Sequence, residues 1–190
     1  MLDVGDTAPE FTVPMATPEH AGDAGAYTSD HVERFDLGEA LEDGPVALAF
    51  FPGVFSRTCT QELCEMRDWH GEMAELGGSA GGADDTAARV YGVSVDTPWS
   101  QLRFVDEYDL DYPLLSGFNS DLVADYGVRR EDGILRGIAK RAVYVVAPDR
   151  TVAYAWLTEE SLTFPDLDAV AEAMAASARG DESAHGDRDD

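Results

Sequence analysis

Residues 46–64 read VALAFFPGVFSRTCTQELC, an apolar run followed by a turn and by both cysteines of the chain. The run Val46–Phe51 has the length and uniform hydrophobicity of a core strand that is covered on both faces. Pro52 ends this strand, and a helix is predicted to begin near Thr58 after the turn. Cys59 therefore falls in the first turn of a helix that leaves the end of a buried strand.

The position of Cys59 predicts a reactive thiol. The first turn of a helix carries unpaired N–H groups and the positive end of the helix dipole, and both stabilise a thiolate. Cys64 lies five residues further along and could trap the oxidised form of Cys59. The alternatives are structural: an inert buried thiol at Cys59, or a core helix residue at Cys64 beside the apolar Leu63.

Helix geometry keeps the two cysteines apart. Five residues of helix rise about 7.5 Å, and the angular offset brings the Cα separation to about 8.5 Å. A disulfide needs a Cα separation of about 4.4–6.8 Å. A Cys59–Cys64 disulfide therefore requires the turns between them to unwind, and the spacing argues against a permanent structural disulfide.

Outside this stretch, strand and helix patterns alternate. The predicted strands and apolar segments are Phe11–Val13, Phe35–Leu41 (a short amphipathic stretch), Val90–Val95, Tyr112–Leu115, Arg141–Val146 and Thr151–Leu157, and the predicted helices are Cys59–Leu76, Pro98–Tyr108, Ser120–Tyr126 and Pro165–Ala178. The order predicts an α/β fold with a central mixed β-sheet flanked by helices, the plan of the thioredoxin-like fold. We expect one domain over residues 1–178, a solvated loop over Gly77–Thr86 and a disordered acidic tail over residues 179–190.

The charge of the chain excludes several partners. Its 190 residues include 38 acidic and 13 basic residues, with Lys140 as the single lysine, and the net charge is -25. Such a surface repels nucleic acid and anionic membranes. The acidic residues are spread along the chain and lysine is nearly absent, which favours a halophilic origin; an acidic tail and a basic binding partner are the alternatives.

Location and cofactors follow from what the sequence lacks. It has neither an apolar run of membrane-spanning length nor a secretion signal, so we expect a cytoplasmic protein. Two cysteines in such a chain point to redox chemistry rather than to structural disulfides. Histidines and cysteines do not have metal-ligand spacing, so neither a metal nor a cofactor is expected.

The turn and helix start resemble the active site of the peroxiredoxin family. The motif of that family is Pro-x-x-x-Thr/Ser-x-x-Cys, and Pro52, Ser56 and Cys59 have the same spacing, with serine in place of the commoner threonine. Thr60-x-Glu62-x-Cys64 and the following Arg67-Asp68 are similar to the bacterioferritin-comigratory-protein branch, where the resolving cysteine lies five residues after the peroxidatic one. Gly5–Phe11 resembles the N-terminal segment of the family, and Gly137–Val146 resembles the strand that carries its active-site arginine.

The resemblance implies roles for a nucleophile and an arginine. Cys59 would attack the peroxide as a thiolate, because the thiolate and not the thiol is the nucleophile. Arg141 would lie beside the sulfur and polarise the peroxide. Its rivals within the same dozen residues are Arg129, Arg130 and Arg136.

Four further residues receive roles from the resemblance. Ser56 offers a hydroxyl that can bond the thiol or a peroxide oxygen, and Pro52 shields the sulfur from water. Glu62 lies one helical turn after the nucleophile and could hold the arginine in a bidentate pair. Cys64 would resolve the oxidised nucleophile as an intramolecular disulfide.

The function implied is a thiol peroxidase that reduces hydrogen peroxide or organic hydroperoxides through a cysteine sulfenic acid. A thioredoxin-like or other thiol reductant would restore the thiols of a monomer or homodimer. One alternative is a general thiol–disulfide oxidoreductase, which the absence of Cys-x-x-Cys disfavours. Another is a non-enzymatic acidic binding protein with the same fold.

Overall fold

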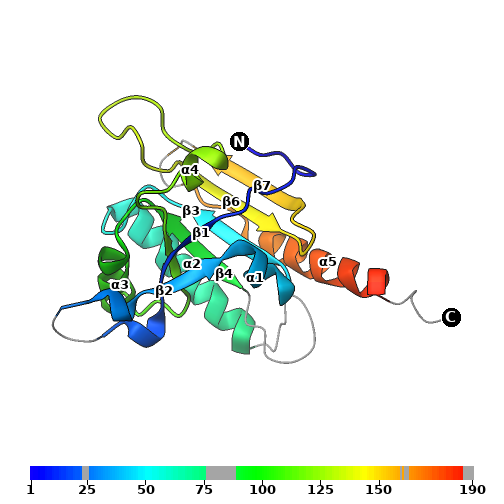
Figure 1. Cartoon of the computed structure of the whole chain (residues 1–190), viewed down its shortest axis with the longest axis horizontal. Helices are drawn as coiled ribbons and strands as arrows, with labels where there is room; N and C mark the ends of the chain where they lie inside the picture. The colour runs from blue at the N-terminus through cyan, green and yellow to red at the C-terminus, as the bar shows by residue number, and fades with distance from the viewer. Residues whose placement is uncertain (23–25, 76–88, 159, 161–162, 186–190) are drawn as a thin grey trace.

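The computed structural model describes residues 1–22, 26–75, 89–158, 160 and 163–185, so the predicted loop Gly77–Thr86 lies outside the described residues. A seven-stranded sheet forms the centre of the described part (Figure 1). The strands are β1 (Thr12–Ala16), β2 (Glu33–Asp36), β3 (Val46–Phe50), β4 (Val90–Ser94), β5 (Leu114–Ser116), β6 (Arg141–Val146) and β7 (Val152–Thr158). The helices are α1 (Leu37–Glu42), α2 (Arg57–Glu75), α3 (Pro98–Glu107), α4 (Leu122–Asp125) and α5 (Leu167–His185), with 3₁₀ turns at Pro18–His20 and Ser29–His31.

The sheet is mixed, as the alternation of elements predicts. Its strand order is β2-β1-β5-β4-β3-β6-β7. β3 pairs in parallel with β4 and antiparallel with β6, and β6 and β7 form the predicted antiparallel hairpin. This order places the C-terminal end of β3 beside the N-terminal end of β6. Two segments that are far apart in the sequence thus meet where α2 begins.

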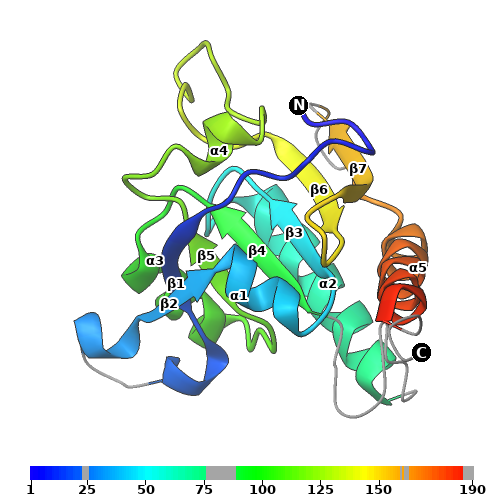
Figure 2. The same ribbon diagram turned by 45° about the vertical axis from the view of Figure 1, so that its right-hand side comes forward.

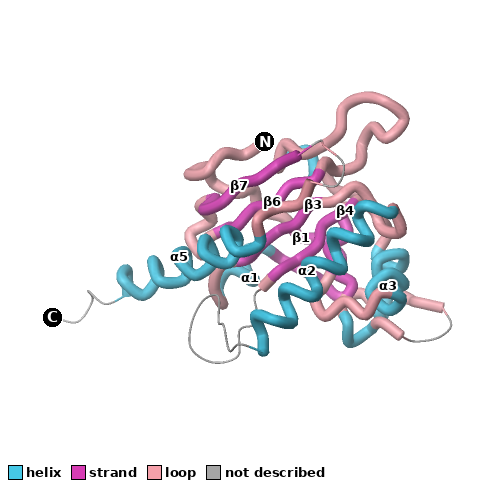
Figure 3. The backbone as a smooth tube through the Cα atoms, turned by 180° about the vertical axis from the view of Figure 1, so that it is seen from behind, coloured by secondary structure: helices cyan, strands magenta, loops and turns pink. Residues whose placement is uncertain are grey.

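Alternate residues of β3 fill two separate cores. Ala47 and Ala49 contribute to the core that α2, α3 and α5 cover, and Figure 3 shows these three helices on one side of the sheet. Val46, Leu48 and Phe50 contribute to the opposite core, together with residues of α1 and α4 (Figure 2). Every residue of β3 is buried, which explains its unbroken hydrophobic run.

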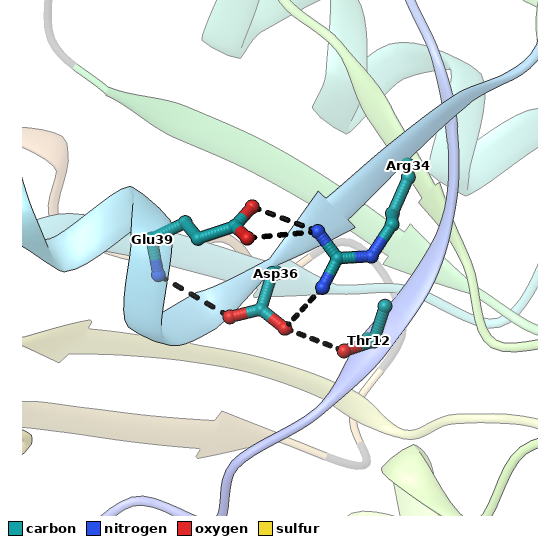
Figure 4. Close-up of polar contacts among 4 residues, drawn as sticks. All are labelled: Thr12, Arg34, Asp36 and Glu39. Atoms are coloured by element: carbon teal, nitrogen blue, oxygen red, sulfur yellow. Dashed lines mark hydrogen bonds and ion pairs between the residues drawn. The ribbon is translucent and has the colours of Figure 1, made fainter.

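Strand β2 is an element that the hydrophobic pattern did not predict. Only Phe35 of this edge strand is buried, so the strand carries little hydrophobic signal. Polar contacts fix it instead: Arg34 pairs with Glu39 at 2.8 Å, and Asp36 accepts hydrogen bonds from Thr12 Oγ1 at 2.6 Å and from the Glu39 amide at 3.2 Å (Figure 4). These hydrogen bonds hold the pKa of the Asp36 carboxyl below its usual value, and the bond from Thr12 has the largest effect. Asp36 thus caps α1 and ties it to the sheet.

Helix α5 is longer than predicted. It begins at Leu167 and continues to His185, seven residues beyond the expected end at Ala178. Val170 and Met174 are buried and hold the helix on the sheet near β6 and β7. The helix therefore includes residues 179–185 of the predicted tail. Residues 186–190 lie outside the described residues, and the domain boundary at residue 178 stays a prediction. No described helix combines the length and hydrophobicity needed to cross a membrane.

Candidate active site

Cys59 lies where the sequence predicts it, in the first turn of α2. The carbonyl of Ser56 accepts a hydrogen bond from the Thr60 amide at 2.8 Å, so Ser56 is the capping residue directly before the first helical residue, Arg57. Cys59 is 0% exposed and belongs to the core beneath α2. The N–H groups ahead of Thr60 have no helical acceptor and surround the thiol with positive potential.

The antiparallel pairing of β6 with β3 brings Arg141 to this turn. Phe50 pairs with Ala142, so Arg141 reaches the end of β3 just where the chain turns toward α2. Its Nη2 donates a hydrogen bond to Sγ of Cys59 at 3.1 Å. Among the described contacts, none joins the rival arginines (Arg129, Arg130 and Arg136) to the sulfur.

Glu62 completes a buried chain of three polar groups. It lies one turn after Cys59, and its Oε2 accepts a hydrogen bond from Nε of Arg141 at 2.8 Å. The side chains of Glu62 and Arg141 are 4% and 12% exposed. Burial raises the pKa of the Glu62 carboxyl to about 7, although the nearby Arg141 acts in the opposite direction. The carboxylate orients the guanidinium, which leaves Nη2 aimed at the sulfur; one bond from Nε replaces the bidentate pair expected from the sequence.

A partly buried polar network, which the sequence pattern does not predict, holds the loop that precedes the helix. Oδ2 of Asp96 accepts from the Val54 amide at 2.9 Å and from the Ser94 hydroxyl at 2.7 Å. The Ser94 hydroxyl in turn accepts a hydrogen bond from Nε2 of the buried Gln101 at 3.0 Å. An aspartate directly after the predicted strand Val90–Val95 was the available signal, because polar residues at the end of a buried parallel strand often line a site.

Phe55 adds strain and an anchor to the same loop. Its φ of 60° lies in the left-handed region, which is uncommon for a residue other than glycine. Its ring packs edge-on against Phe104 of α3 with centroids 5.2 Å apart. The contact and the Asp96 network fix a conformation that the local sequence does not favour.

Pro52 and Ser56 lie in the loop between β3 and α2, and their roles stay predictions. Pro52 is half-buried and Ser56 is exposed. The described hydrogen bonds include none from the Ser56 hydroxyl to Cys59.

Cys64 is a half-buried free thiol on the same helix as Cys59. Burial raises the pKa of the Cys64 thiol, and the positive charge of Arg67 opposes that effect. Both cysteines lie within the helix α2, so their Cα atoms are too far apart for a disulfide. A disulfide between Cys59 and Cys64 therefore requires local unwinding. Within the described residues, no group of three or more His, Cys, Asp or Glu side chains could hold a metal ion.

Comparison with known proteins agrees with this arrangement. The model of the AhpC/TSA family matches residues 4–155. MT1643 of Mycobacterium tuberculosis, whose name marks it as a candidate peroxiredoxin, is 33% identical over 80% of this chain and 82% of its own length. A thiol peroxidase of Mycobacterium bovis is 30% identical over 91% of this chain and 88% of its own.

A solved structure with a related sequence has the same fold. The crystal structure of peroxidoxin BcpB from Mycobacterium tuberculosis superposes with a TM-score of 0.65 at 30% identity, covering 95% of this chain and 98% of that one. The family match extends over the strand, the loop, both cysteines and Arg141, which are the parts that build the site. The chain therefore belongs to the AhpC/TSA family of peroxiredoxins.

Proposed function

We propose that the protein is a thiol peroxidase in which Cys59 reduces hydrogen peroxide or an organic hydroperoxide. The observation that carries the proposal is the hydrogen bond from Arg141 Nη2 to the buried Cys59 sulfur, with Glu62 holding the guanidinium from behind. Membership of the family supports a peroxidase activity. The specific roles of the residues rest on the geometry described above.

In the first step the Cys59 thiolate attacks one oxygen of the peroxide. The S–O bond forms as the O–O bond breaks, and the second oxygen leaves with the electron pair and takes a proton to become water or an alcohol. The Cys59 sulfur becomes a sulfenic acid. Arg141 stabilises the thiolate before attack and the negative charge that develops on the leaving oxygen.

In the second step Cys64 resolves the sulfenic acid. Its thiolate attacks the Cys59 sulfur, a disulfide forms and the hydroxyl leaves as water. The first turns of α2 must unwind for the sulfurs to meet, and unwinding at a helix start breaks few hydrogen bonds. A thioredoxin-like or other thiol reductant then returns both cysteines to thiols, in a cytoplasmic monomer or homodimer.

Burial of Cys59 fits this order of events. A Cys59 residue that is 0% exposed in the folded helix cannot be reached by a bulky protein disulfide. A hydroperoxide is far smaller than a protein disulfide, so it displaces fewer side chains on its way to the sulfur. The folded helix therefore favours peroxide over protein disulfides as the first reactant, which distinguishes the proposal from a general thiol–disulfide oxidoreductase.

The test is peroxide consumption by the wild type and by Cys59→Ser, with free thiols counted before and after one equivalent of hydrogen peroxide. We expect the wild type to lose both thiols and Cys59→Ser to lose activity completely. Cys64→Ser should react once and stop as a sulfenic acid that a dimedone-type probe labels. Appreciable peroxide turnover by Cys59→Ser contradicts the nucleophile, and insulin reduction without peroxide turnover would support the oxidoreductase alternative.

A further inference from the structure

Three polar contacts join helix α2 to the segment 108–112 in the described part of the chain, and all of them lie at or beyond Leu63. The contacts are Tyr112 Oη donating to the Leu63 carbonyl at 2.9 Å, Arg67 Nη1 donating to the Tyr108 carbonyl at 2.7 Å, and His70 Nδ1 lying 2.9 Å from Asp111 Oδ2. The segment follows α3 and leads into β5, so it belongs to the framework that holds the sheet. The later turns of α2 are thus tied by polar contacts to the segment that connects α3 to β5.

The first turns of α2 have a different attachment. In the described part of the chain, the side-chain hydrogen bonds from residues 57–62 to other elements are those that Arg141 makes with Cys59 and Glu62. Oxidation of Cys59 removes the thiolate that Arg141 binds. The two ends of the helix therefore differ in what holds them once the reaction has begun.

The Leu63 carbonyl lies at the boundary between the two parts. If residues 57–62 unwind, their carbonyls stop accepting from the amides four residues later, which are those up to Met66. The Leu63 carbonyl accepts from the Arg67 amide and is the first acceptor that remains. Tyr112 donates to this same carbonyl, and its side chain is 1% exposed, so unwinding past Leu63 would leave a buried hydroxyl without a partner.

We propose that Tyr112 is a positioning residue that stops the unwinding of α2 at Leu63. The inference rests on the proposed Cys59–Cys64 disulfide. Residues 57–62 then leave the helix and carry Cys59 toward Cys64, which stays in place on the helix that begins at Leu63. Because the unwinding stops at Leu63, the Cys64 thiol keeps its position, and only the oxidised Cys59 has to move for the disulfide to form.

The experiment is amide hydrogen exchange, resolved by residue, on the full chain before and after one equivalent of hydrogen peroxide. In the oxidised wild type we expect the amides of residues 61–66 to lose protection and those of residues 67–70 to keep it. In oxidised Tyr112→Phe the loss of protection should extend through His70. In the reduced state Tyr112→Phe should speed exchange of the Arg67 amide about five-fold, the effect of one hydrogen bond of ordinary net strength.

Tyr144→Phe is the matched control. Tyr144 is also fully buried, and its hydroxyl also donates to a backbone carbonyl, that of Tyr126 at 3.1 Å, in the opposite core. It should leave the exchange of α2 unchanged. If the amides of α2 exchange at the same rates in oxidised Tyr112→Phe and oxidised Tyr144→Phe, Tyr112 does not stop the unwinding at Leu63.

The wild type alone provides a second test that needs no variant. A disulfide that forms with the amides of residues 67–70 exposed overturns the role of Tyr112 and leaves the proposed function intact. If thiol counting finds no Cys59–Cys64 disulfide after peroxide, the resolution step itself is wrong, and the role of Tyr112 in it is wrong as well. Thiol counting and exchange therefore separate the two failures.

Discussion

Arg141 donates a hydrogen bond from Nη2 to Sγ of Cys59 at 3.1 Å across 82 residues of sequence. The contact exists because β6 runs antiparallel to β3, which puts the first residue of β6 beside the last residues of β3. The turn after β3 then needs only a few residues to bring the start of α2 over the same point. Sheet topology thus assembles a nucleophile and a cation from distant parts of the chain.

Removal of this cation should slow the reaction with peroxide. Arg141→Ala loses one preorganised donor, which by analogy with an oxyanion-hole donor costs about 10²–10³ in rate. Arg136→Ala is the control, because Arg136 is exposed and has no described contact with the sulfur. The measurement is the second-order rate constant of thiol loss with hydrogen peroxide. If Arg136→Ala lowers this rate constant and Arg141→Ala leaves it unchanged, Arg136 and not Arg141 is the arginine that assists the reaction.

Much of this site could be predicted from the sequence because its signals are local. The buried strand, the proline, the turn and the cysteine all occur within residues 46–59. In this stretch the length of the apolar run predicts the strand, and the residues after the proline predict the start of the helix. Arg141 was predicted from its place before an apolar strand together with the family resemblance. The antiparallel register that sets its distance from Cys59 depends on strand order, which no local pattern contains.

The raised pKa of Glu62 predicts a pH dependence of stability with a defined sign. A carboxyl whose pKa is about 7 in the folded protein and 4.5 without the fold binds a proton on folding. Its contribution to stability is full below pH 4.5 and is lost as the pH rises through about 7. One pKa unit corresponds to about 1.4 kcal/mol, so wild type should lose about 3 kcal/mol between pH 4.5 and 8 from this group.

Glu62→Gln isolates that contribution. The amide does not titrate, and its oxygen can still accept from Nε of Arg141, so the variant keeps the geometry of the protonated carboxyl. The free energy of unfolding, measured by denaturant across this pH range, should fall for the wild type relative to Glu62→Gln. Parallel curves for the two proteins would mean that the Glu62 carboxyl titrates at its ordinary value in the fold.

The network beneath the active-site loop predicts a positioning effect at Asp96. Asp96→Ala removes the acceptor of the Val54 amide and of the Ser94 hydroxyl. Hydrogen bonds to a charged group are worth about 1.5–3 kcal/mol, so we expect a loss of this size in the free energy of unfolding and a slower reaction with peroxide. Asp149→Ala, which removes an exposed carboxylate that accepts from the Thr151 amide, is the control. Wild-type rates in Asp96→Ala would show that Phe55 packing alone holds the loop.

Asp96, Tyr112 and strand β2 escaped prediction for a common physical reason. Each depends on a polar contact with a residue distant in sequence: Asp96 with Val54 across 42 positions, Tyr112 with Leu63 across 49, and Asp36 of β2 with Thr12 across 24. Hydrophobic periodicity reports which face of an element is buried, and it carries no information about which backbone group a buried hydroxyl will meet. Helix α5 was predicted too short because residues 179–190 have no apolar residue except Ala184 and therefore read as a solvated tail, although Arg179, Glu182 and Ala184 are residue types that favour helix.

The net charge of -25 predicts that salt stabilises the protein. At about 0.01 M salt the Debye length is about 30 Å, and at 1 M it is about 3 Å, so added salt screens repulsion across the whole domain. The thermal midpoint should rise steeply over a potassium chloride series and should keep rising in the molar range if the acidic surface is a halophilic adaptation. A midpoint that does not change with salt would remove the halophilic interpretation.

A chain that ends at Ala178 separates the two sources of this charge. Residues 179–190 contain four aspartates and one glutamate against two arginines, so their removal changes the net charge by three and leaves most of the excess in place. If the acidic surface of the domain causes the salt dependence, the shortened chain should keep nearly the full slope of midpoint against salt. A slope that disappears on shortening would assign the effect to the C-terminal segment, and would favour an acidic arm that binds a basic partner.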